Sequence, residues 1–326
     1  MREELFAGVD IHKDDYVGCI VDKDGQIVRE RTFPPTKEGA EGFFCGMPVK
    51  AVAIEACSMW RAAYNLFRER QEVKLASAKK TNDIVGEKKM DKFDAKALAN
   101  LLRVGYLPEV HIPTDDILDL RELCRHKSNL TRTRVTYQNK IKSHLLMHGI
   151  KYPVKLWNKK NLQWLRDQED FKVLNLLNIR ETVAKEENEV LKQIGKISRN
   201  RKVTNLLMTV PGIAEFGALM ILSEISDIKR FKTPKELVKY TGLCPGKYQT
   251  GKTERDVKCH AVNKWLKWIV TECSGRASTL KNTKFQYHFA KINKRKNSKV
   301  ARRSTARKML TIIWHMLQNE EPYHAS

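Results

Sequence analysis

The sequence lacks the features of a secreted or membrane-spanning protein. It contains no signal peptide and no apolar run of about 18 residues, the length that a membrane-spanning helix requires. Its seven cysteines form no CxxC pair, and no common zinc pattern matches the spacing of Cys244, Cys259, His260 and Cys273. We therefore expect free thiols in a reducing cytoplasm, with no disulfide framework and no membrane partner.

Acidic residues are scarce in the second part of the chain. Residues 1–110 hold 18 basic and 18 acidic side chains, whereas residues 111–326 hold 43 and 20, which accounts for the whole net charge of +23. An excess of this size favours a polyanionic partner, most simply nucleic acid. A basic surface that serves only solubility is the alternative.

Proline is almost absent from residues 115–200, where Pro153 stands alone. Leu123, Leu130 and Tyr137 repeat at intervals of seven, as do Val183, Val190 and Ile197. The pattern predicts two long helices, joined around 147–165, that pair as a helical hairpin or coiled coil. Lys127 and Arg134 interrupt the apolar seam, and a plain helical bundle remains equally open.

The first 110 residues alternate between strand and helix patterns. The predicted strands are LFAGVD, YVGCIV, IVRERTF, VKAVAIEA and VKLAS, and the predicted helices cover 36–46, 58–71 and DKFDAKALANLLRVG. KKTNDIVGEKK is predicted to be a basic loop, with at most a helical turn. The resulting order, β-β-β-α-β-α-β-α, is that of the RNase H-like fold. In that fold the first strand pairs with its hairpin partner and with the strand after the first helix.

Four carboxylates stand at the ends of these elements. Asp10 ends the first strand and Glu55 ends the fourth, so both are expected at one edge of the sheet. Asp91 and Asp94 are three residues apart on the next helix and share a face. A buried carboxylate is costly unless it is paired or binds a metal, and Mg²⁺ prefers oxygen ligands. The four residues therefore predict a Mg²⁺ (or Mn²⁺) site for phosphodiester chemistry, although Glu55 as a helix cap and Asp94 as a helix-dipole acid are the structural alternatives.

Residues 201–326 read as mostly helical. VPGIAEFGALMILSEI resembles a helix-hairpin-helix, in which a tight glycine turn lets backbone amides approach a phosphate, and a buried turn without ligand is the alternative. GLCPGKYQTGKTERDVKC is predicted to be a loop. The basic run at 291–308 supplies the predicted phosphate contacts Lys294, Arg295, Lys296, Arg302 and Arg303.

GVDIHK, the IEA at Glu55 and DKFDAKALANLL resemble the DEDD transposases of the insertion sequence 110 family. VPGIAEFGALMILSEISDIKRFKTPKELVKYTGLCPG and ARRSTARKMLTIIWHMLQNEEPY resemble the second half of that family. The resemblance implies a RuvC-like (RNase H-like) domain over 1–110, a helical segment over 111–200 and a C-terminal transposase domain over 201–326. It also implies that Asp10, Glu55, Asp91 and Asp94 form the metal site.

The same resemblance implies recombination of donor and target DNA through a Holliday-junction-like intermediate. It further implies a structured guide (bridge) RNA, a homodimer or tetramer, and a nucleoid-associated prokaryotic protein. The family uses a serine nucleophile after its GLxP motif, and the matching position here is Thr250, with Lys247 and Lys252 nearby. Thr250, Tyr248 or Thr253 could act as nucleophile, or this copy could be impaired. A water-dependent junction resolvase and a non-catalytic nucleic-acid-binding relative are the alternative functions.

Overall fold

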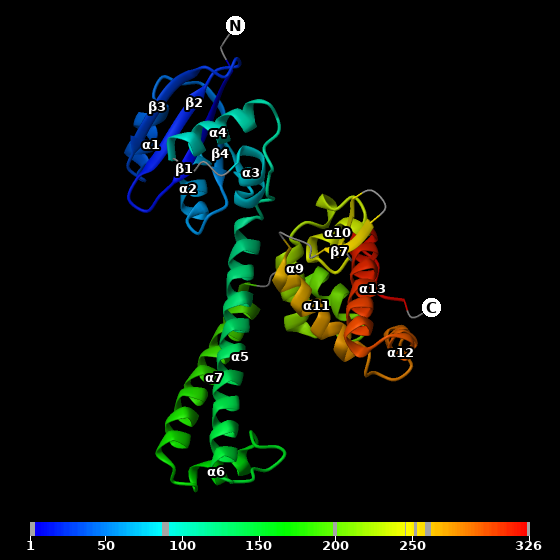
Figure 1. Cartoon of the computed structure of the whole chain (residues 1–326). Helices are drawn as coiled ribbons and strands as arrows, with labels where there is room; N and C mark the ends of the chain where they lie inside the picture. The colour runs from blue at the N-terminus through cyan, green and yellow to red at the C-terminus, as the bar shows by residue number, and fades with distance from the viewer. Residues whose placement is uncertain are drawn as a thin grey trace. The chain divides into compact units, whose positions relative to one another are not determined.

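The chain folds into two compact units, Met1–Ile112 and Pro113–Ser326. The computed structural model describes residues 4–86, 91–197, 201–244, 246–250, 253–257 and 262–324. The first unit mixes strands and helices, and the second is mostly helical (Figure 1). The predicted class, α/β followed by all-α, is thus confirmed at this level, whereas the division of the second unit at residue 200 stays a prediction.

The first unit is built on a five-stranded sheet in the order β3-β2-β1-β4-β5 (Figure 1). The strands are β1 (Leu5–Ile11), β2 (Tyr16–Val21), β3 (Ile27–Phe33), β4 (Val49–Glu55) and β5 (Glu72–Ala76). β1 lies in the middle, antiparallel to β2 and parallel to β4, which confirms the pairing predicted from the element order. Central strands buried on both faces read as apolar runs, as LFAGVD and VKAVAIEA do.

Helices cover both faces of this sheet. On one face, α1 (Lys37–Phe44) and α2 (Trp60–Phe67) pack their aromatic and small residues against alternate residues of β1. On the other face, α4 (Asp91–Arg103) buries Ala95 and Ala99 against β1 and β2. Residues of β1 alternate between these two layers, so Gly8 and Asp10 share the face that α4 covers.

The segment KKTNDIVGEKK differs from its prediction as a loop. Residues Ala78–Val85 form a helix, α3, which ends at Gly86 with a φ of 88°. Its sequence is polar, and Thr81 is the residue that it buries among those described. A helix with so little apolar surface gives no periodic signal in the sequence.

The second unit begins with two long antiparallel helices, α5 (Asp115–Met147) and α7 (Phe171–Ile197), with the short α6 (Lys159–Arg166) between them. Their far end encloses a small core that includes Ile141, Leu165 and Leu177. The charged residues that interrupt the apolar seam have a partner in α7. Nζ of Lys127 and Nε of Arg134 lie 3.2 and 2.7 Å from the carboxylate of Glu187.

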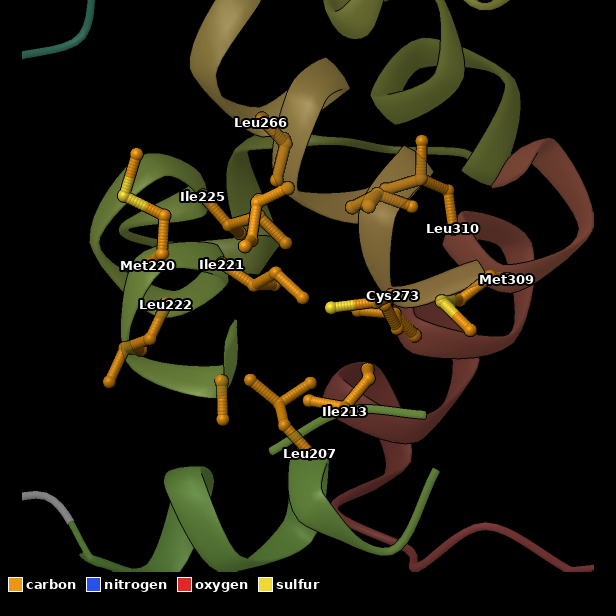
Figure 2. Packing of buried hydrophobic residues seen from close by; sticks show 14 of the residues in the cluster. Leu207, Ile213, Met220, Ile221, Leu222, Ile225, Leu266, Cys273, Met309 and Leu310 are labelled. Carbon is orange, nitrogen blue, oxygen red and sulfur yellow. The ribbon is translucent and has the colours of Figure 1, made fainter. Parts of the chain in front are cut away.

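The remaining helices surround the largest hydrophobic core among the described residues (Figure 2). They are α8 (Arg201–Met208), α9 (Glu215–Ile225), the 3₁₀ turn η1 (Ile228–Arg230), α10 (Pro234–Thr241), α11 (Lys264–Ala277), α12 (Lys284–Arg295) and α13 (Ser298–Asn319). Figure 2 shows Ile221 of α9, Cys273 of α11 and Met309 of α13 meeting in this core. No helix in the described part of the chain is long and apolar enough to cross a membrane.

The glycine turn that precedes α9 packs against another helix. Gly212 has a φ of 88°, and a Cβ at this position would lie 2.5 Å from the carbonyl oxygen of Cys273 in α11. Glycine is therefore required both by the left-handed backbone and by the close approach of α11. This packing explains the turn without a ligand, and the phosphate contact of a helix-hairpin-helix stays a prediction.

Candidate active site

Three of the four predicted acids line one pocket of the first unit. Asp10 comes from β1, Glu55 from the end of β4 and Asp94 from the first turns of α4. Asp10 and Glu55 follow the paired residues Val9 and Ile54, so they stand side by side at one edge of the sheet. The prediction that strand ends and helix would converge is thus met by these three residues. Asp91 opens α4, and its side chain lies outside the described residues.

A glycine brings α4 close enough to complete this pocket. A Cβ on Gly8 would lie 2.1 Å from the carbonyl oxygen of Ala95 and 2.5 Å from the amide nitrogen of Ala99. Gly8 and Asp10 share one face of β1, and Asp94 directly precedes Ala95. The missing side chain at Gly8 therefore lets the backbone of α4 lie against β1 and sets the position of Asp94.

Asp10 is held by its immediate neighbours. Its Oδ1 accepts a hydrogen bond from the amide of Ile11 at 3.0 Å, and Nε2 of His12 lies 3.0 Å from Oδ2. The side chain of Asp10 is 14% exposed, so this carboxylate is mostly removed from water. Glu55 does not cap the following helix, because α2 begins after Met59. The structural alternative for Glu55 is therefore wrong.

The pocket offers the ligands that a hard divalent cation prefers, namely carboxylate oxygens. Within the side chains that the structure describes, no three acids, histidines or cysteines converge at metal-binding distance, and Asp91 is not among the side chains tested. One further polar group fits such a site. Thr81, on α3, is 6% exposed, and its buried hydroxyl has no hydrogen-bond partner among the described residues.

Sequence reasoning missed the contribution of α3 to this pocket. Thr81, Asn82 and Val85 line it together with Ala97 and Leu98 of α4. A buried hydroxyl without a partner is unfavourable, so an unpaired one beside three acids fits a site that binds a polar ligand. The isolated Thr81-Asn82 pair in a polar segment carried no signal that could have identified it.

Thr250 lies in a β-hairpin, where the sequence predicted a loop. β6 (Gly246–Thr250) and β7 (Thr253–Val257) pair antiparallel, and Thr250 pairs with Thr253 at the tip. Lys247 lies in β6, but its side chain and that of Thr250 are outside the described residues, as is Lys252 altogether. The loop prediction failed because GKYQT and TERDV lack the apolar alternation that marks a strand.

The base of this hairpin is fixed from both sides. Gly242 has a φ of 65°, and a Cβ there would lie 2.6 Å from Cγ1 of Val262, so the two ends of the hairpin meet closely. Arg307 of α13 donates two hydrogen bonds to the carbonyl of Leu243, at 3.2 and 2.9 Å. Nζ of Lys267 lies 3.3 Å from the carbonyl oxygen of Gly242. Gly242 and Leu243, which precede the hairpin, and Val262, which follows it, are therefore held together next to α11 and α13.

The predicted phosphate contacts lie around the junction of α12 and α13. Lys294 and Arg295 end α12, Lys296 follows it, and Arg302 and Arg303 lie in the first two turns of α13. All five are exposed. Asn297 caps α13 through a 3.0 Å hydrogen bond from the amide of Val300, which orders the short connection between the two helices. The five cations thus stand on an ordered helical corner that is open to solvent.

Comparison with known proteins identifies the family. Residues 7–149 match a family model described as Transposase, and residues 204–290 match one described as Transposase IS116/IS110/IS902 family. The chain belongs to this transposase family. The first match contains the four acids and the second contains the Thr250 hairpin. The protein is therefore a transposase, an enzyme of DNA transposition and recombination encoded by insertion sequences.

Individual relatives match over different shares of their length. The transposase for insertion sequence element IS1111A of Coxiella burnetii is 22% identical over 99% of this chain and 92% of its own length. The transposase for insertion sequence element IS1328 of Yersinia enterocolitica is 24% identical over 77% of each chain. The putative transposase y4qE of Sinorhizobium fredii is 29% identical over 57% of this chain, and that alignment covers 47% of the relative.

Proposed function

We propose that this transposase cleaves and exchanges DNA strands with a divalent metal held in the acid pocket of the first unit. The observation that carries the proposal is the convergence of Asp10, Glu55 and Asp94, from three separate elements, on one pocket. Asp91, one turn before Asp94 on α4, would complete the carboxylate set. Mg²⁺ or Mn²⁺ suits such oxygen donors.

The sheet supports a RuvC-like, RNase H-like scaffold for this site. The sheet, in the order 3-2-1-4-5, contains the predicted pairing of β1 with its hairpin partner β2 and with β4. In the proposed site a bound cation would stabilise the charge on the attacked phosphate. Neighbouring residues would position the carboxylates that hold this cation. The amide of Ile11 and the ring of His12 orient Asp10, and α4, which packs on Gly8, aligns Asp94.

Thr250 is the proposed nucleophile of the same reaction. Its hydroxyl would displace a deoxyribose oxygen from the phosphate and leave a threonine–DNA phosphodiester. The methyl group of threonine crowds this attack relative to serine, so the wild type is expected to be slower than its serine variant. Thr250 belongs to the second unit and the acids to the first, so the proposed reaction draws on both units.

Donor and target DNA are the proposed substrates, and a structured guide RNA is the proposed source of target choice. The positive charge of the second unit suits both kinds of nucleic acid. Strand exchange needs at least two active sites, so we propose a homodimer or tetramer. A water-dependent junction resolvase is the second candidate, because threonine replaces the serine that the family uses.

Metal-dependent cleavage of DNA carrying the element ends tests the proposal. Asp10→Asn, Glu55→Gln and Asp94→Asn should each abolish cleavage in Mg²⁺ while the protein remains folded by circular dichroism. Asp83→Asn is the matched control, because Asp83 is exposed on α3 and does not line the pocket. Nearly full cleavage by Asp10→Asn would overturn the assignment.

A further inference from the structure

A second pocket lies at the base of the Thr250 hairpin. It is lined by Arg125, Tyr240, Val262, Asn263, Lys264 and Trp265. Val262 packs on Gly242 where the two ends of the hairpin meet, and the amide of Asn263 donates to the carbonyl of Tyr240 at 2.8 Å. The pocket is therefore formed by the end of α10, the start of α11 and one residue of α5.

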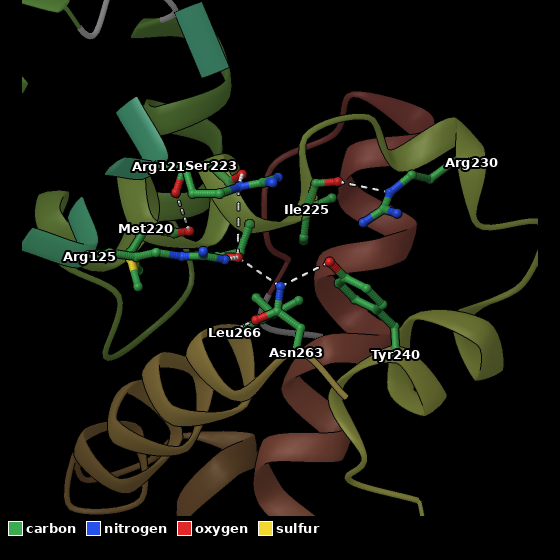
Figure 3. A network of polar contacts seen from close by, with 10 residues as sticks. Arg121, Arg125, Met220, Ser223, Ile225, Arg230, Tyr240, Asn263 and Leu266 are labelled. Carbon is green, nitrogen blue, oxygen red and sulfur yellow. Dashed lines mark hydrogen bonds and ion pairs between the residues drawn. The ribbon is translucent and has the colours of Figure 1, made fainter. Parts of the chain in front are cut away.

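A completely buried carboxylate holds this pocket in shape. Glu224 of α9 is 0% exposed and accepts two hydrogen bonds from Arg125, from Nε at 2.7 Å and from Nη2 at 2.8 Å. Figure 3 shows Arg125, Asn263 and Tyr240 of this network. Nδ2 of Asn263 donates to the same carboxylate at 2.7 Å and to the hydroxyl of Tyr240 at 2.9 Å. Such a network, with the carboxylate fully paired, fixes both the guanidinium and the start of α11.

The charges around Glu224 do not cancel. Nε of Arg121 lies 3.8 Å from its Oε2, so two guanidinium groups surround one carboxylate. Lys264 adds a further exposed cation, and Arg132 lies over the ring of Trp265 with 5.7 Å between its Cζ and the ring centroid. The pocket therefore keeps an excess of positive charge on a rigid frame.

Arg125 still has hydrogen-bonding capacity toward the pocket. Glu224 occupies Nε and Nη2, whereas Nη1 makes no hydrogen bond within the described residues. The side chain of Arg125 is 37% exposed. Beside it, Asn263 caps the 14-residue α11 by accepting from the amide of Leu266 at 2.8 Å, so the positive end of a helix also borders the pocket.

We propose that this pocket binds one backbone phosphate of the DNA strand on which the Thr250 hairpin acts. Nη1 of Arg125 and Nζ of Lys264 would donate to the phosphate oxygens, and the N-terminus of α11 would add to the attraction. β6 advances by four residue steps from Gly246 to Thr250, a length of about 13 Å. The bound phosphate would therefore be a few nucleotides from the one attacked. The inference rests on the proposed DNA substrate and on attack at the Thr250 hairpin, but not on the acid pocket.

Binding of the full-length protein to duplex DNA carrying the element end, measured in EDTA by fluorescence anisotropy, tests the pocket without any cleavage. Lys264→Gln should weaken binding and reduce the slope of log K against log salt by about one. The double variant Arg125→Gln/Glu224→Gln removes both charges of the pair and should also weaken binding, although Arg121 then loses the carboxylate that lies 3.8 Å from its Nε. Lys235→Gln is the control of equal charge, because Lys235 is exposed on α10 and does not line the pocket.

A series of DNAs, each with one neutral methylphosphonate, would locate the contact. At one position near the cleaved phosphate, the methylphosphonate should lower the affinity of the wild type about tenfold. At the same position it should not lower the affinity of Lys264→Gln any further. Equal losses at every position in both proteins would overturn the proposal, as would Lys264→Gln binding like Lys235→Gln. Competition by inorganic phosphate at millimolar concentration, with no position-specific loss, would indicate a site for a free anion instead. If the wild type showed this binding pattern but did not cleave DNA, the result would contradict the proposed function and leave the phosphate site supported.

Discussion

Gly8 of β1 lies directly beneath Ala95 of α4, so closely that a Cβ on Gly8 would stand 2.1 Å from the Ala95 carbonyl oxygen. Asp10 is two residues along the same face of β1, and Asp94 is the residue before Ala95. This contact sets the distance between two proposed metal ligands. It therefore links the packing of the sheet to the geometry of the acid pocket.

Gly8→Ala should displace α4 and loosen the pocket. We expect a loss of about 1–3 kcal/mol in the free energy of unfolding. The nearest atoms belong to the backbone of Ala95 and Ala99, so no side-chain rotation can relieve the overlap. Urea denaturation measures this loss, and Mn²⁺ titration should show weaker binding. Gly42→Ala is the control, because Gly42 lies in α1 with open space around it. This variant should gain about 0.5–1 kcal/mol in the free energy of unfolding, since alanine has the higher helix propensity. Unchanged stability and Mn²⁺ affinity in Gly8→Ala would contradict this role.

Thr81→Val should separate metal binding from folding. The substitution keeps the shape of the side chain but removes a buried hydroxyl that has no partner among the described residues. Without metal, the variant should be as stable as the wild type or about 1 kcal/mol more stable. Its affinity for Mn²⁺, followed by electron paramagnetic resonance, should fall, and Thr81→Ser should restore it. A variant that is destabilised in EDTA but binds Mn²⁺ normally would show that the hydroxyl is paired within the protein.

The pairing of α5 with α7 should weaken in acid. Burial acts to raise the pKa of Glu187, but hydrogen bonds from Arg134, Thr131 and Lys127 outweigh it and hold the pKa below the ordinary value of 4.5. A carboxyl with a lowered folded-state pKa stabilises the protein above its unfolded pKa and loses that contribution as the pH falls through the folded value.

Thermal unfolding followed by circular dichroism checks this between pH 7 and pH 3. At pH 7, Glu187→Gln should be about 2 kcal/mol less stable than the wild type, and the difference should shrink below pH 4.5. Glu181→Gln is the control, because the Arg166–Glu181 pair is 41% and 30% exposed and should contribute less than about 1 kcal/mol. A stability difference that stays constant with pH would exclude titration of Glu187 as the cause.

Most nucleic-acid affinity should reside in the second unit. A fragment of residues 113–326 should bind duplex DNA with a steep salt dependence, because it carries the whole net charge of +23. A fragment of residues 1–112, which is neutral, should bind little at physiological salt. Replacing Lys294, Arg295, Lys296, Arg302 and Arg303 together by glutamine should lower the salt slope of the larger fragment. Equal affinity of the two fragments would contradict the assignment.

The sequence predicted the parts of the fold that carry a periodic signal. LFAGVD and VKAVAIEA indicated central strands because both of their faces are apolar, and their terminal acids then indicated the pocket edge. The polar helix α3 and the polar hairpin β6–β7 were missed, because neither sequence shows the apolar periodicity that marks a helix or a strand. Glu224 was missed for another reason. A single glutamate in an apolar helix suggests the face of the helix that is exposed to solvent, and its partners Arg125 and Asn263 are distant in sequence.

Trapping of a covalent protein–DNA adduct tests the central claim most directly. Full-length protein is incubated with Mg²⁺, guide RNA from the element end and matched donor and target DNA, then denatured and examined for a protein-linked strand. The account predicts an adduct with the wild type, an equal or larger amount with Thr250→Ser, and none with Thr250→Ala or Asp10→Asn, although both of these should still bind DNA. An adduct that forms undiminished in Thr250→Ala, or DNA cleavage by the wild type without any adduct, would contradict it.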